Sequence, residues 1–316
     1  MIPPGPLLMG VLNLTPDSFS DGGRLPTVDA VLCQSRRMLA QGAAVLDLGA
    51  QSTRPGAAMV GPEEELRRLL PALRALQPLR REHPDLLLSI DTFEAAVAEA
   101  ALAEGADWIN DVRGANHTAG ALGGTLRDPA MLPLIARAGC PYVLMHSRGT
   151  SQTMDSLAVY GDVVAEVRAE LQDATDTALA AGVRPDQIIW DLGLGFAKTT
   201  EQNLQLLKRL QELTSADQMP ECLSQASPPS SQALLSTPVT PSQPLTRRPP
   251  ARPYPLLVGP SRKRFIGVVL DEPRPRARLW GTAAVCALAV AAGARVLRVH
   301  DVGPIAQVTR MAAAIG

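Results

Sequence analysis

Eight short apolar segments, separated by longer stretches with helical periodicity, constrain the fold of this 316-residue chain most strongly. The predicted strands span 7–14, 44–48, 86–90, 108–112, 142–146, 188–192, 255–259 and 295–299. Their apolar residues are almost continuous instead of alternating, which is typical of parallel strands buried on both faces. Between them, apolar residues recur at helical spacing, as in the predicted helices 63–76, 163–180 and 201–213. We expect a kink in the first of these at Pro71.

Eight strands, each followed by a helix, predict an α/β fold of the (β/α)8 TIM-barrel type. The alternative is an open doubly wound sheet, in which ligands bind at one switch point. Polar residues favour the barrel, because almost every predicted strand ends in one, as expected if all eight strand ends meet at one mouth. These residues are Asn13, Asp47, Asp91, Asn110, His146, Asp191, Ser261 to Lys263, Arg298 and His300.

One segment does not fit the barrel pattern. Residues 214–253 contain nine of the 28 prolines, together with seven serines and four glutamines, and they lack glycine and any hydrophobic period. Such a stretch buries too little apolar surface to offset the entropy of ordering it, so we predict a disordered insert. Without it, residues 1–213 and 254–316 make a single barrel domain, with the insert between the sixth helix and the seventh strand. Connections from a helix to the next strand lie on the face of the barrel opposite the carboxyl ends of the strands.

Composition excludes some classes of function. The chain has 30 basic and 31 acidic residues and a net charge of -1, which argues against a nucleic-acid partner. No uninterrupted run of 18 apolar residues occurs, so we predict no membrane-spanning segment, and we interpret 281–297 as a buried helix followed by a strand. The four cysteines have no metal-binding or redox spacing, and the first residues lack the basic segment of a signal peptide. These features predict a cytoplasmic protein.

Two motifs follow the first two strands. In MGVLNLTPDSFSDGG (9–23), Asn13 is a neutral oxygen ligand suited to a hydrated Mg2+ that also contacts substrate phosphate, or else merely part of a turn. In DLGAQSTRPGA (47–57), Thr53 and Arg54 offer a hydroxyl and a guanidinium suited to phosphate oxygens. A solvated arginine is the alternative interpretation of the second motif.

Further along the chain, Asp91, Asn110 and Asp191 end the third, fourth and sixth strands. Each could simply cap the following helix. Three such groups in one pocket instead fit a flat heterocycle, whose exocyclic amine and ring N–H donate to a carboxylate. The segments GPSRKRFIG (259–267) and RVHDV (298–302) add Lys263, Arg298 and His300 for an anionic group. Loops after the seventh and eighth strands of barrels often bind phosphate.

Together these segments resemble the dihydropteroate synthase family, the folate-pathway enzymes among the pterin-binding barrels, over almost the whole chain outside 214–253. The resemblance implies a transferase that joins a dihydropterin methyl diphosphate to p-aminobenzoate and releases pyrophosphate. It also implies Mg2+ as cofactor, bound with the help of Asn13, and a homodimer. The implied pterin site is Asp91, Asn110, Asp191 and Lys263; the diphosphate site is Thr53, Arg54, Arg298 and His300; the p-aminobenzoate pocket is Pro55, Phe196 and Ser261. Of these, Asp91, Lys263, Arg298 and His300 are the implied catalytic residues.

The chain departs from the family pattern at Gln51, Leu192 and Ala197, where the family commonly has Glu, Pro and Gly. We expect the last two to affect the loop that carries Phe196 and Lys198. Two other functions stay open. A methyltetrahydrofolate-dependent methyltransferase would need no diphosphate motifs, and a non-catalytic pterin-binding protein would not need the charged groups at the mouth.

Overall fold

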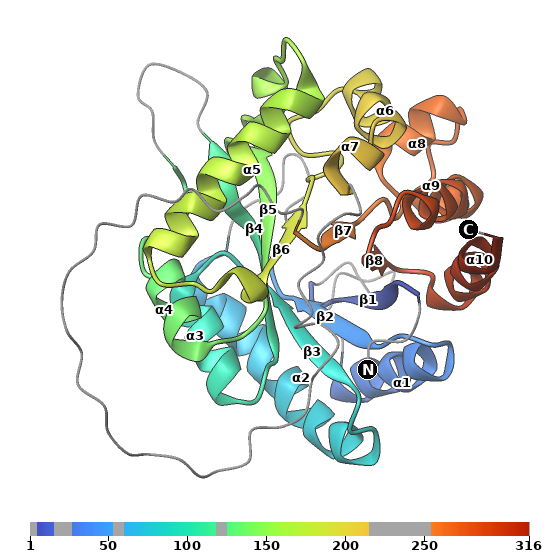
Figure 1. Ribbon diagram of the computed structural model, residues 1–316. Coiled ribbons are helices and arrows are strands. Elements are labelled where there is room, and N and C mark those ends of the chain that lie inside the picture. Colours follow the sequence, from blue (N-terminus) through green and yellow to red (C-terminus); the bar gives the residue numbers. More distant parts are fainter. Residues whose placement is uncertain (1–4, 16–26, 53–59, 118–124, 215–253, 316) are drawn as a thin grey trace, which may run out of the picture.

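The computed structural model describes residues 5–15, 27–52, 60–117, 125–214 and 254–315. The eight strands in these ranges form a closed parallel barrel, in which each strand pairs with its neighbours in sequence and β8 pairs with β1 (Figure 1). They are β1 (Leu7–Asn13), β2 (Val45–Gly49), β3 (Leu87–Asp91), β4 (Trp108–His117), β5 (Tyr142–Arg148), β6 (Ile188–Asp191), β7 (Leu256–Val258) and β8 (Val296–Val299). The barrel prediction is confirmed, and the pairing of β8 with β1 excludes the open sheet.

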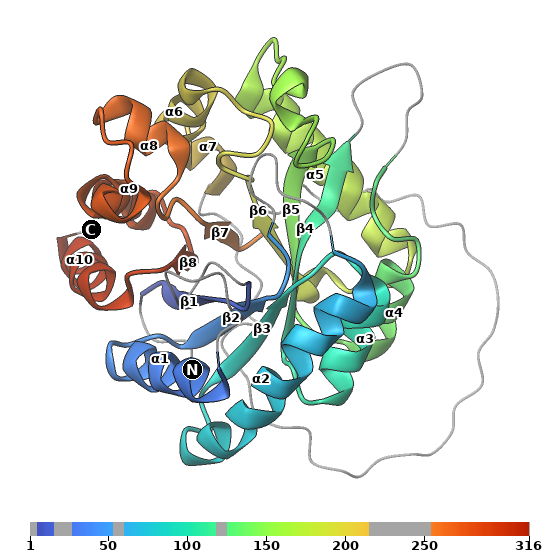
Figure 2. The same ribbon diagram turned by 180° about the vertical axis from the view of Figure 1, so that it is seen from behind.

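Helices alternate with the strands and surround the barrel, as the two opposite views show (Figures 1 and 2). They are α1 (Val28–Ala40), α2 (Pro62–Glu82), α3 (Ala95–Ala103), α4 (Met131–Ala138), α5 (Val163–Ala180), α6 (Thr200–Lys208), α7 (Gln211–Thr214), α8 (Arg264–Val269), α9 (Leu279–Ala291) and α10 (Val302–Ile315). Short 3-10 helices are η1 (Met154–Leu157), η2 (Pro185–Gln187) and η4 (Pro275–Arg278). None of the helices in the described ranges combines the length and the apolar character needed to cross a membrane.

The core has two layers, because successive residues of a strand point to opposite faces of the sheet. One layer lies between strands and helices and contains fully buried residues such as Leu46, Leu88 and Leu144. The other fills the barrel interior and consists of Met9, Val45, Trp108, Val143, Ile189, Leu257 and Val296. Fully burying one such aliphatic side chain contributes about 1.5–3 kcal/mol. The continuous apolar strands of the sequence are therefore explained by burial on both faces.

Helix and strand boundaries differ from the prediction by one or more residues in many elements, and most in α2, in the predicted helix 201–213 and in β4. Helix α2 is longer than expected and continues past Pro71, and the predicted helix 201–213 is divided into α6 and α7. Strand β4 runs on to His117 through a register shift after Asp111. These are differences in extent, and the element types are as predicted.

The apolar residues at helical spacing in the predicted helix 201–213 do not all face the core. Leu204 is 42% exposed, whereas Asn203 is buried. The amide of Asn203 accepts a hydrogen bond from the backbone N–H of Gly195 at 2.7 Å and donates to the carbonyl of Thr199 at 2.6 Å. Asn203 thus takes the inward position because it stabilises the loop before α6.

The predicted insert, 214–253, lies outside the described residues except for Thr214, which is the last residue of α7. Residues 215–253 connect the end of a helix to the start of β7, and strand starts lie on the face of a barrel opposite the mouth.

Candidate active site

Polar side chains reach the mouth by the same alternation that fills the barrel interior. A residue two positions after an interior apolar residue lies on the same face of its strand, nearer the carboxyl end. This step relates four pairs: Val45 and Asp47, Trp108 and Asn110, Ile189 and Asp191, and Val296 and Arg298. The strands therefore bring these polar groups together above the apolar layer of the barrel interior.

Arg298 is the centre of a buried charge network. Its Nε donates to Asp47 Oδ2 and its Nη2 to Asp91 Oδ2, both at 2.6 Å. Asp47 is fully buried and also accepts from Ser89 Oγ at 2.6 Å and from Asn110 Nδ2 at 3.2 Å. Charged hydrogen bonds of this kind are strong and directional. The network therefore fixes the orientation of Asp91 and Asn110.

A cavity adjoins this network and is lined by all four residues predicted to hold the pterin: Asp91, Asn110, Asp191 and Lys263. Arg298 and Phe196 also line it. Because Asn110 donates its amide N–H to Asp47, its Oδ1 is left as an acceptor, and this buried atom has no hydrogen-bond partner among the described residues. Buried polar atoms are nearly always paired, so the atom marks a place where a ligand donor belongs.

Burial shifts the proton affinities of the cavity's charged groups. It raises the pKa of Asp91, against the attraction of Arg298, and it raises the pKa of Asp191, against a hydrogen bond from Gly193. Burial also lowers the pKa of Lys263 to about 8, and Asp191 opposes this change. A ligand that donates N–H groups to these carboxylates favours their ionised forms.

The three consecutive cations after β7 have three different surroundings. Arg262 pairs with Asp301, with Nη2 and Oδ1 2.7 Å apart, and Arg264 forms an exposed pair with Asp155 at 3.2 Å. Lys263 enters the cavity, where its Nζ lies 4.2 Å from the centre of the Phe196 ring. Of this charge run, Lys263 is therefore the member that contributes to the cavity.

The side chain of Arg278 holds the backbone of the same loop by hydrogen bonds. It donates to the carbonyls of Arg262, at 3.0 Å, and Glu272, at 2.9 Å, among others. Ser261 Oγ in turn accepts from the backbone N–H of His300 and lies 2.9 Å from its Nδ1. The loops after β7 and β8 are therefore joined, and His300 is held at the end of β8.

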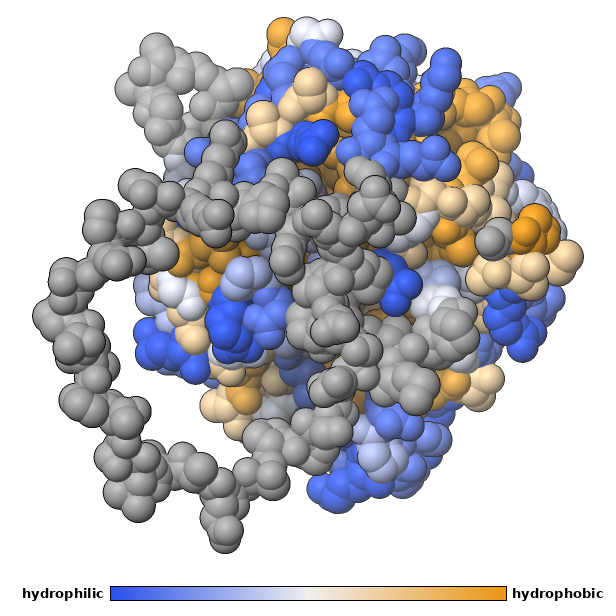
Figure 3. All heavy atoms as spheres, viewed as in Figure 1, coloured by the Kyte–Doolittle hydropathy of each residue, from blue (hydrophilic) through white to orange (hydrophobic). Residues whose placement is uncertain are grey.

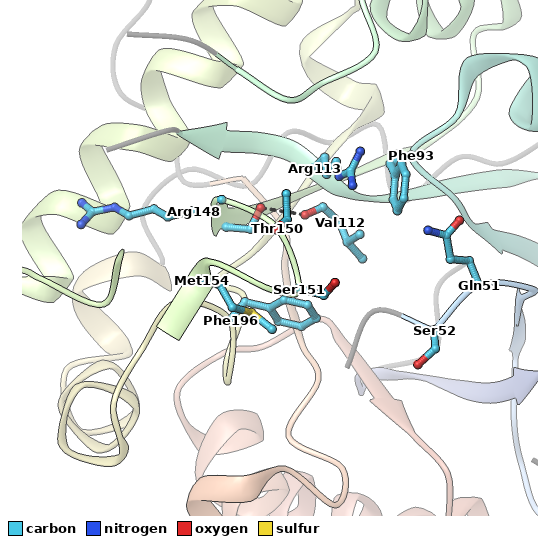
Figure 4. Close-up of a pocket in the computed structure, with 12 residues that line it drawn as sticks. Gln51, Ser52, Phe93, Val112, Arg113, Arg148, Thr150, Ser151, Met154 and Phe196 are labelled. Carbon is cyan, nitrogen blue, oxygen red and sulfur yellow. Dashed lines mark hydrogen bonds between the residues drawn. The ribbon is translucent and has the colours of Figure 1, made fainter. Parts of the chain in front are cut away.

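A second cavity lies beside the first, and Phe196 and Val112 line both (Figure 4). Figure 4 shows Gln51 and Phe93 across the cavity from Phe196. The guanidinium of Arg113 lies 3.6 Å from the centre of the Phe93 ring. Gln51 Oε1 is buried and has no hydrogen-bond partner in the part of the chain that the structure describes. This cavity thus combines aromatic walls with one vacant acceptor.

His146 corrects one expectation. It was expected to end at the mouth, but its Nε2 lies 2.8 Å from Glu170 Oε2 on α5, outside the barrel. His146 follows Met145, which lies beneath the mouth with Phe93, by one position. A one-residue step changes the face of the strand, so His146 points away from the mouth.

The remaining predicted site residues either line neither of the two cavities or lie outside the described residues. Thr53, Arg54 and Pro55 lie outside the described residues. Ser261 contacts His300 and lines neither cavity. Asn13 ends β1 beside Gly49, whose other strand neighbour is Asp91. Within the described ranges, no group of three or more His, Cys, Asp or Glu could hold a metal ion.

Three polar residues near the site had no predicted role in binding: Asp47, which was expected only to lie at the mouth, Ser89, and Lys198 of the loop after β6. The signal for the first two was present, because Asp47 follows an interior valine by two residues and Ser89 precedes Asp91 by two. For Lys198 no such signal exists, because it lies in a loop and its contacts come from β5 and from that loop itself.

Known proteins resemble this chain along nearly its whole length. The sequence profile of the family described as pterin binding enzyme matches residues 9–300. The dihydropteroate synthase of Synechocystis sp. is 42% identical over 308 residues, which are 98% of this chain and 89% of that protein. That of Mycobacterium leprae is 40% identical over 301 residues, 93% of this chain and 88% of that protein.

Solved structures agree with the sequence comparison. A dihydropteroate synthase from Thermus thermophilus, in complex with 4-aminobenzoate, is 37% identical with a TM-score of 0.73 and covers 99% of this chain and 95% of that one. One from Xanthomonas albilineans, in complex with 7,8-dihydropteroate, is 34% identical with a TM-score of 0.73 and covers 98% and 94%. Both fold and sequence are therefore similar over the entire barrel.

Proposed function

The chain belongs to the dihydropteroate synthases of the pterin-binding enzyme family, and from this premise we propose how its barrel mouth carries out the reaction. The enzyme joins a dihydropterin methyl diphosphate to p-aminobenzoate and forms dihydropteroate and pyrophosphate. The bond between the pterin methylene carbon and the diphosphate oxygen breaks, and a bond from that carbon to the aryl amine nitrogen forms. The amine then loses a proton to solvent. The methyltransferase and the non-catalytic alternatives are set aside.

The single observation that carries the proposal is the set of acceptors around the first cavity. Asn110 Oδ1 has no partner within the described ranges, and the carboxylates of Asp91 and Asp191 lie beside it along the cavity wall. The amine and ring N–H groups of a pterin are matching donors. Lys263 supplies the donor for a ring nitrogen or carbonyl oxygen of the same heterocycle. These four residues would hold the pterin.

The diphosphate end would be bound by Arg298 and His300, together with Thr53 and Arg54, which the sequence assigns to it. The Nε and Nη2 atoms of Arg298 already donate to Asp47 and Asp91, so its Nη1 remains for a diphosphate oxygen. Asp91, held by Arg298, would stabilise positive charge that develops on the pterin methylene as the diphosphate leaves. Fixed charges aimed at developing charge are usually the largest contribution to catalysis.

Mg2+ is the proposed cofactor. Asn13 offers a hard oxygen ligand at the end of β1. A site with few protein ligands suits Mg2+, which commonly keeps waters and binds substrate phosphates. When bound, the ion would neutralise charge on the leaving diphosphate. Asn13 would hold it together with oxygens of the substrate.

The p-aminobenzoate would lie against Phe196, where the two cavities meet. Its amine then faces the pterin methylene, and it needs proximity more than activation because an aryl amine is a neutral nucleophile. Pro55 and Ser261 are assigned to this pocket by the resemblance of the sequence alone.

We also propose a homodimer in the cytoplasm. Large apolar side chains are exposed on α9 and α10, including Trp280, Leu288, Met311 and Ile315. Figure 3 shows apolar surface on the side of the molecule where α8, α9 and α10 lie. Exposed apolar patches on a protein commonly mark interfaces. The free thiols of Cys33, Cys140 and Cys286 suit a reducing compartment.

A pyrophosphate-release assay tests the proposed function. Purified protein with Mg2+, the dihydropterin methyl diphosphate and p-aminobenzoate should release one pyrophosphate for each dihydropteroate formed. Chelation of Mg2+ should slow the reaction, and Asn13→Ala should raise the Mg2+ concentration needed for half-maximal rate. Absence of pyrophosphate release with all components present would refute the assignment.

A further inference from the structure

Lys198 is the feature of the fold that the reaction does not explain. It is 4% exposed, it lines neither cavity, and no carboxylate lies within ion-pair distance of it in the described ranges. Its Nζ contacts three groups: His146 Nδ1 at 2.9 Å, the Phe196 carbonyl at 3.0 Å and the Gly193 carbonyl at 3.1 Å. A buried lysine with this arrangement calls for a role, because burying a charge is costly unless it is well paired.

We propose that Lys198 is a positioning residue, which ties the loop 193–198 to β5 and thereby sets the place of Phe196 between the two cavities. The kinetic part of this inference rests on the proposed function. Lys198 does not contact the substrate sites, so its effect must pass through the loop backbone and Phe196.

The hydrogen bonds of Lys198 are complete. An ammonium has three N–H donors, and here three acceptors surround it. Burial lowers the pKa of His146 to about 3, so the imidazole is neutral, with Nε2–H donating to Glu170 and Nδ1 accepting from Lys198. Burial also lowers the pKa of Lys198 to about 7, against the attraction of Asp191 and Glu170. Even a neutral amine keeps two N–H groups, one for each loop carbonyl.

The loop itself has a backbone that needs to be held. Gly193 has a φ of 62°, and a Cβ there would collide with the carbonyl oxygen of His146. Ala197 has a φ of 47°, in the left-handed region that is unfavourable for a residue with a Cβ. A loop with a strained residue persists because surrounding contacts determine its conformation.

Two further contacts act on the same loop. Tyr160 Oη donates to the carbonyl of Ala197 at 3.0 Å, and Asn203 accepts from the N–H of Gly195 at 2.7 Å. Lys198 differs from them in holding the carbonyl of Phe196 itself. The aromatic ring of Phe196 in turn contacts the ammonium of Lys263. Displacement of the loop would therefore move a wall that both substrates share.

Substitution of Lys198 by methionine tests the inference, because methionine keeps the apolar stem and removes all three donors. We expect Lys198→Met to raise the KM for p-aminobenzoate about tenfold, with a smaller change in kcat. Lys198→Gln keeps two N–H donors on a shorter side chain, so its KM should lie between those of the wild type and Lys198→Met. The matched control is Lys208→Met, at an exposed lysine of α6, which should leave both constants unchanged.

A spectroscopic measurement makes the test independent of turnover. The chain has four phenylalanines, so fluorine-labelled phenylalanine gives few 19F NMR signals, and Phe196→Leu identifies the one that belongs to Phe196. That signal should shift or broaden in Lys198→Met and stay in place in Lys208→Met. If Lys198→Met does not fold, as judged by circular dichroism, Lys198→Gln carries the same two measurements.

The outcomes separate the two claims. A wild-type protein without pyrophosphate release would contradict the proposed function, while the 19F signal still decides on Lys198. A wild-type protein that turns over, with an unchanged KM and an unchanged Phe196 signal in the Lys198 variants, would overturn the inference.

Discussion

Single residues at the mouth differ in what they contribute even when their charges are the same. Lys263 and Arg264 are adjacent cations, yet the first lines the cavity with Asp91, Asn110 and Asp191, and the second forms an exposed pair with Asp155. The difference comes from the loop after β7, whose carbonyls are held by Arg278. The presence of a charge therefore does not identify a functional cation. The direction in which the side chain points does.

Replacing Lys263 by alanine should lower kcat/KM by about 10²-fold, because one positioned group that stabilises a charged or polar centre typically accounts for 10²–10³ in rate. Binding of a pterin analogue, measured by calorimetry, should weaken as well. Arg264→Ala is the matched control and should change kcat/KM less than about twofold, given the small energy of exposed ion pairs. Equal effects of the two substitutions would show that Lys263 has no special role.

Arg298 should matter for stability as well as for catalysis. Arg298→Met leaves Asp47 fully buried without its countercharge, and removing one partner of a buried ion pair costs about 3–5 kcal/mol. Urea unfolding would measure this loss. The control is Arg36→Met, which breaks an exposed pair with Glu82 and should cost less than about 1 kcal/mol. A loss for Arg298→Met no larger than that of the control would mean that Asp47 is compensated by Ser89 and Asn110 alone.

Among the elements, α2 carries an unusual buried acid. Glu65 lies in the first turn of this helix, is 1% exposed, and neither of its oxygens has a hydrogen-bond partner in the described ranges. Burial raises its pKa from 4.5 to about 7. The nearby Thr92 side chain lowers this pKa slightly, and the negative charge of Asp91 raises it further. Glu65 is therefore protonated in the folded protein at mildly acidic pH.

This pKa shift predicts a pH-dependent stability. Between pH 4.5 and about 7 the folded state keeps a proton that the unfolded state has lost, so the free energy of unfolding falls as the pH rises through this range. Glu65→Gln should therefore be more stable than the wild type at pH 8, by about 3 kcal/mol. At pH 4 the two should be equal.

Urea unfolding at several pH values measures the effect of Glu65→Gln. Glu63→Gln, at an exposed position in the same turn, is the control and should show no pH-dependent difference from the wild type. A constant gap between Glu65→Gln and the wild type across this pH range would contradict the assigned pKa.

For the whole molecule, the candidate site and the connections from helices to strands lie at opposite ends of the barrel. The start of β7, which follows residues 215–253 in the sequence, lies opposite the mouth. Replacing residues 215–253 by a short Gly/Ser linker should leave kcat/KM within about twofold and should not lower the stability, since a shorter loop costs less entropy to close. Steady-state kinetics and urea unfolding would check both. A large loss of kcat/KM in a folded variant would show that the segment contributes to the mouth.

The proposed dimer makes a separate prediction for the molecule as a whole. Trp280 and Leu288 of α9 are 76% and 63% exposed and lie eight residues apart, on one face of the helix. Trp280→Glu should convert the dimer to a monomer in light scattering, because it places a charge in an apolar interface. Val159→Glu, at another exposed apolar residue outside α9, is the control and should leave the mass unchanged. A monomeric wild type would remove the proposal.

The sequence by itself determined the architecture, because parallel strands buried on both faces need continuous apolar runs and these are visible without a structure. It also placed Asp91, Asn110, Asp191, Lys263 and Arg298 at strand ends or in the loops that follow, and the structure brings all five to one cavity. The extent of α2, β4 and α6 was less predictable, since tertiary contacts such as those of Asn203 decide where a helical pattern is used.

The tertiary structure alone decided which polar groups meet. His146 and Asp47 looked equivalent in the sequence, yet one contacts α5 and the other holds Arg298 inside the barrel. Lys198 gave no signal at all, because its three partners are two loop carbonyls and an imidazole more than fifty residues away. Strand periodicity is a local property that a sequence displays, whereas the pairing of a buried charge depends on groups that only the closed barrel brings within hydrogen-bond distance.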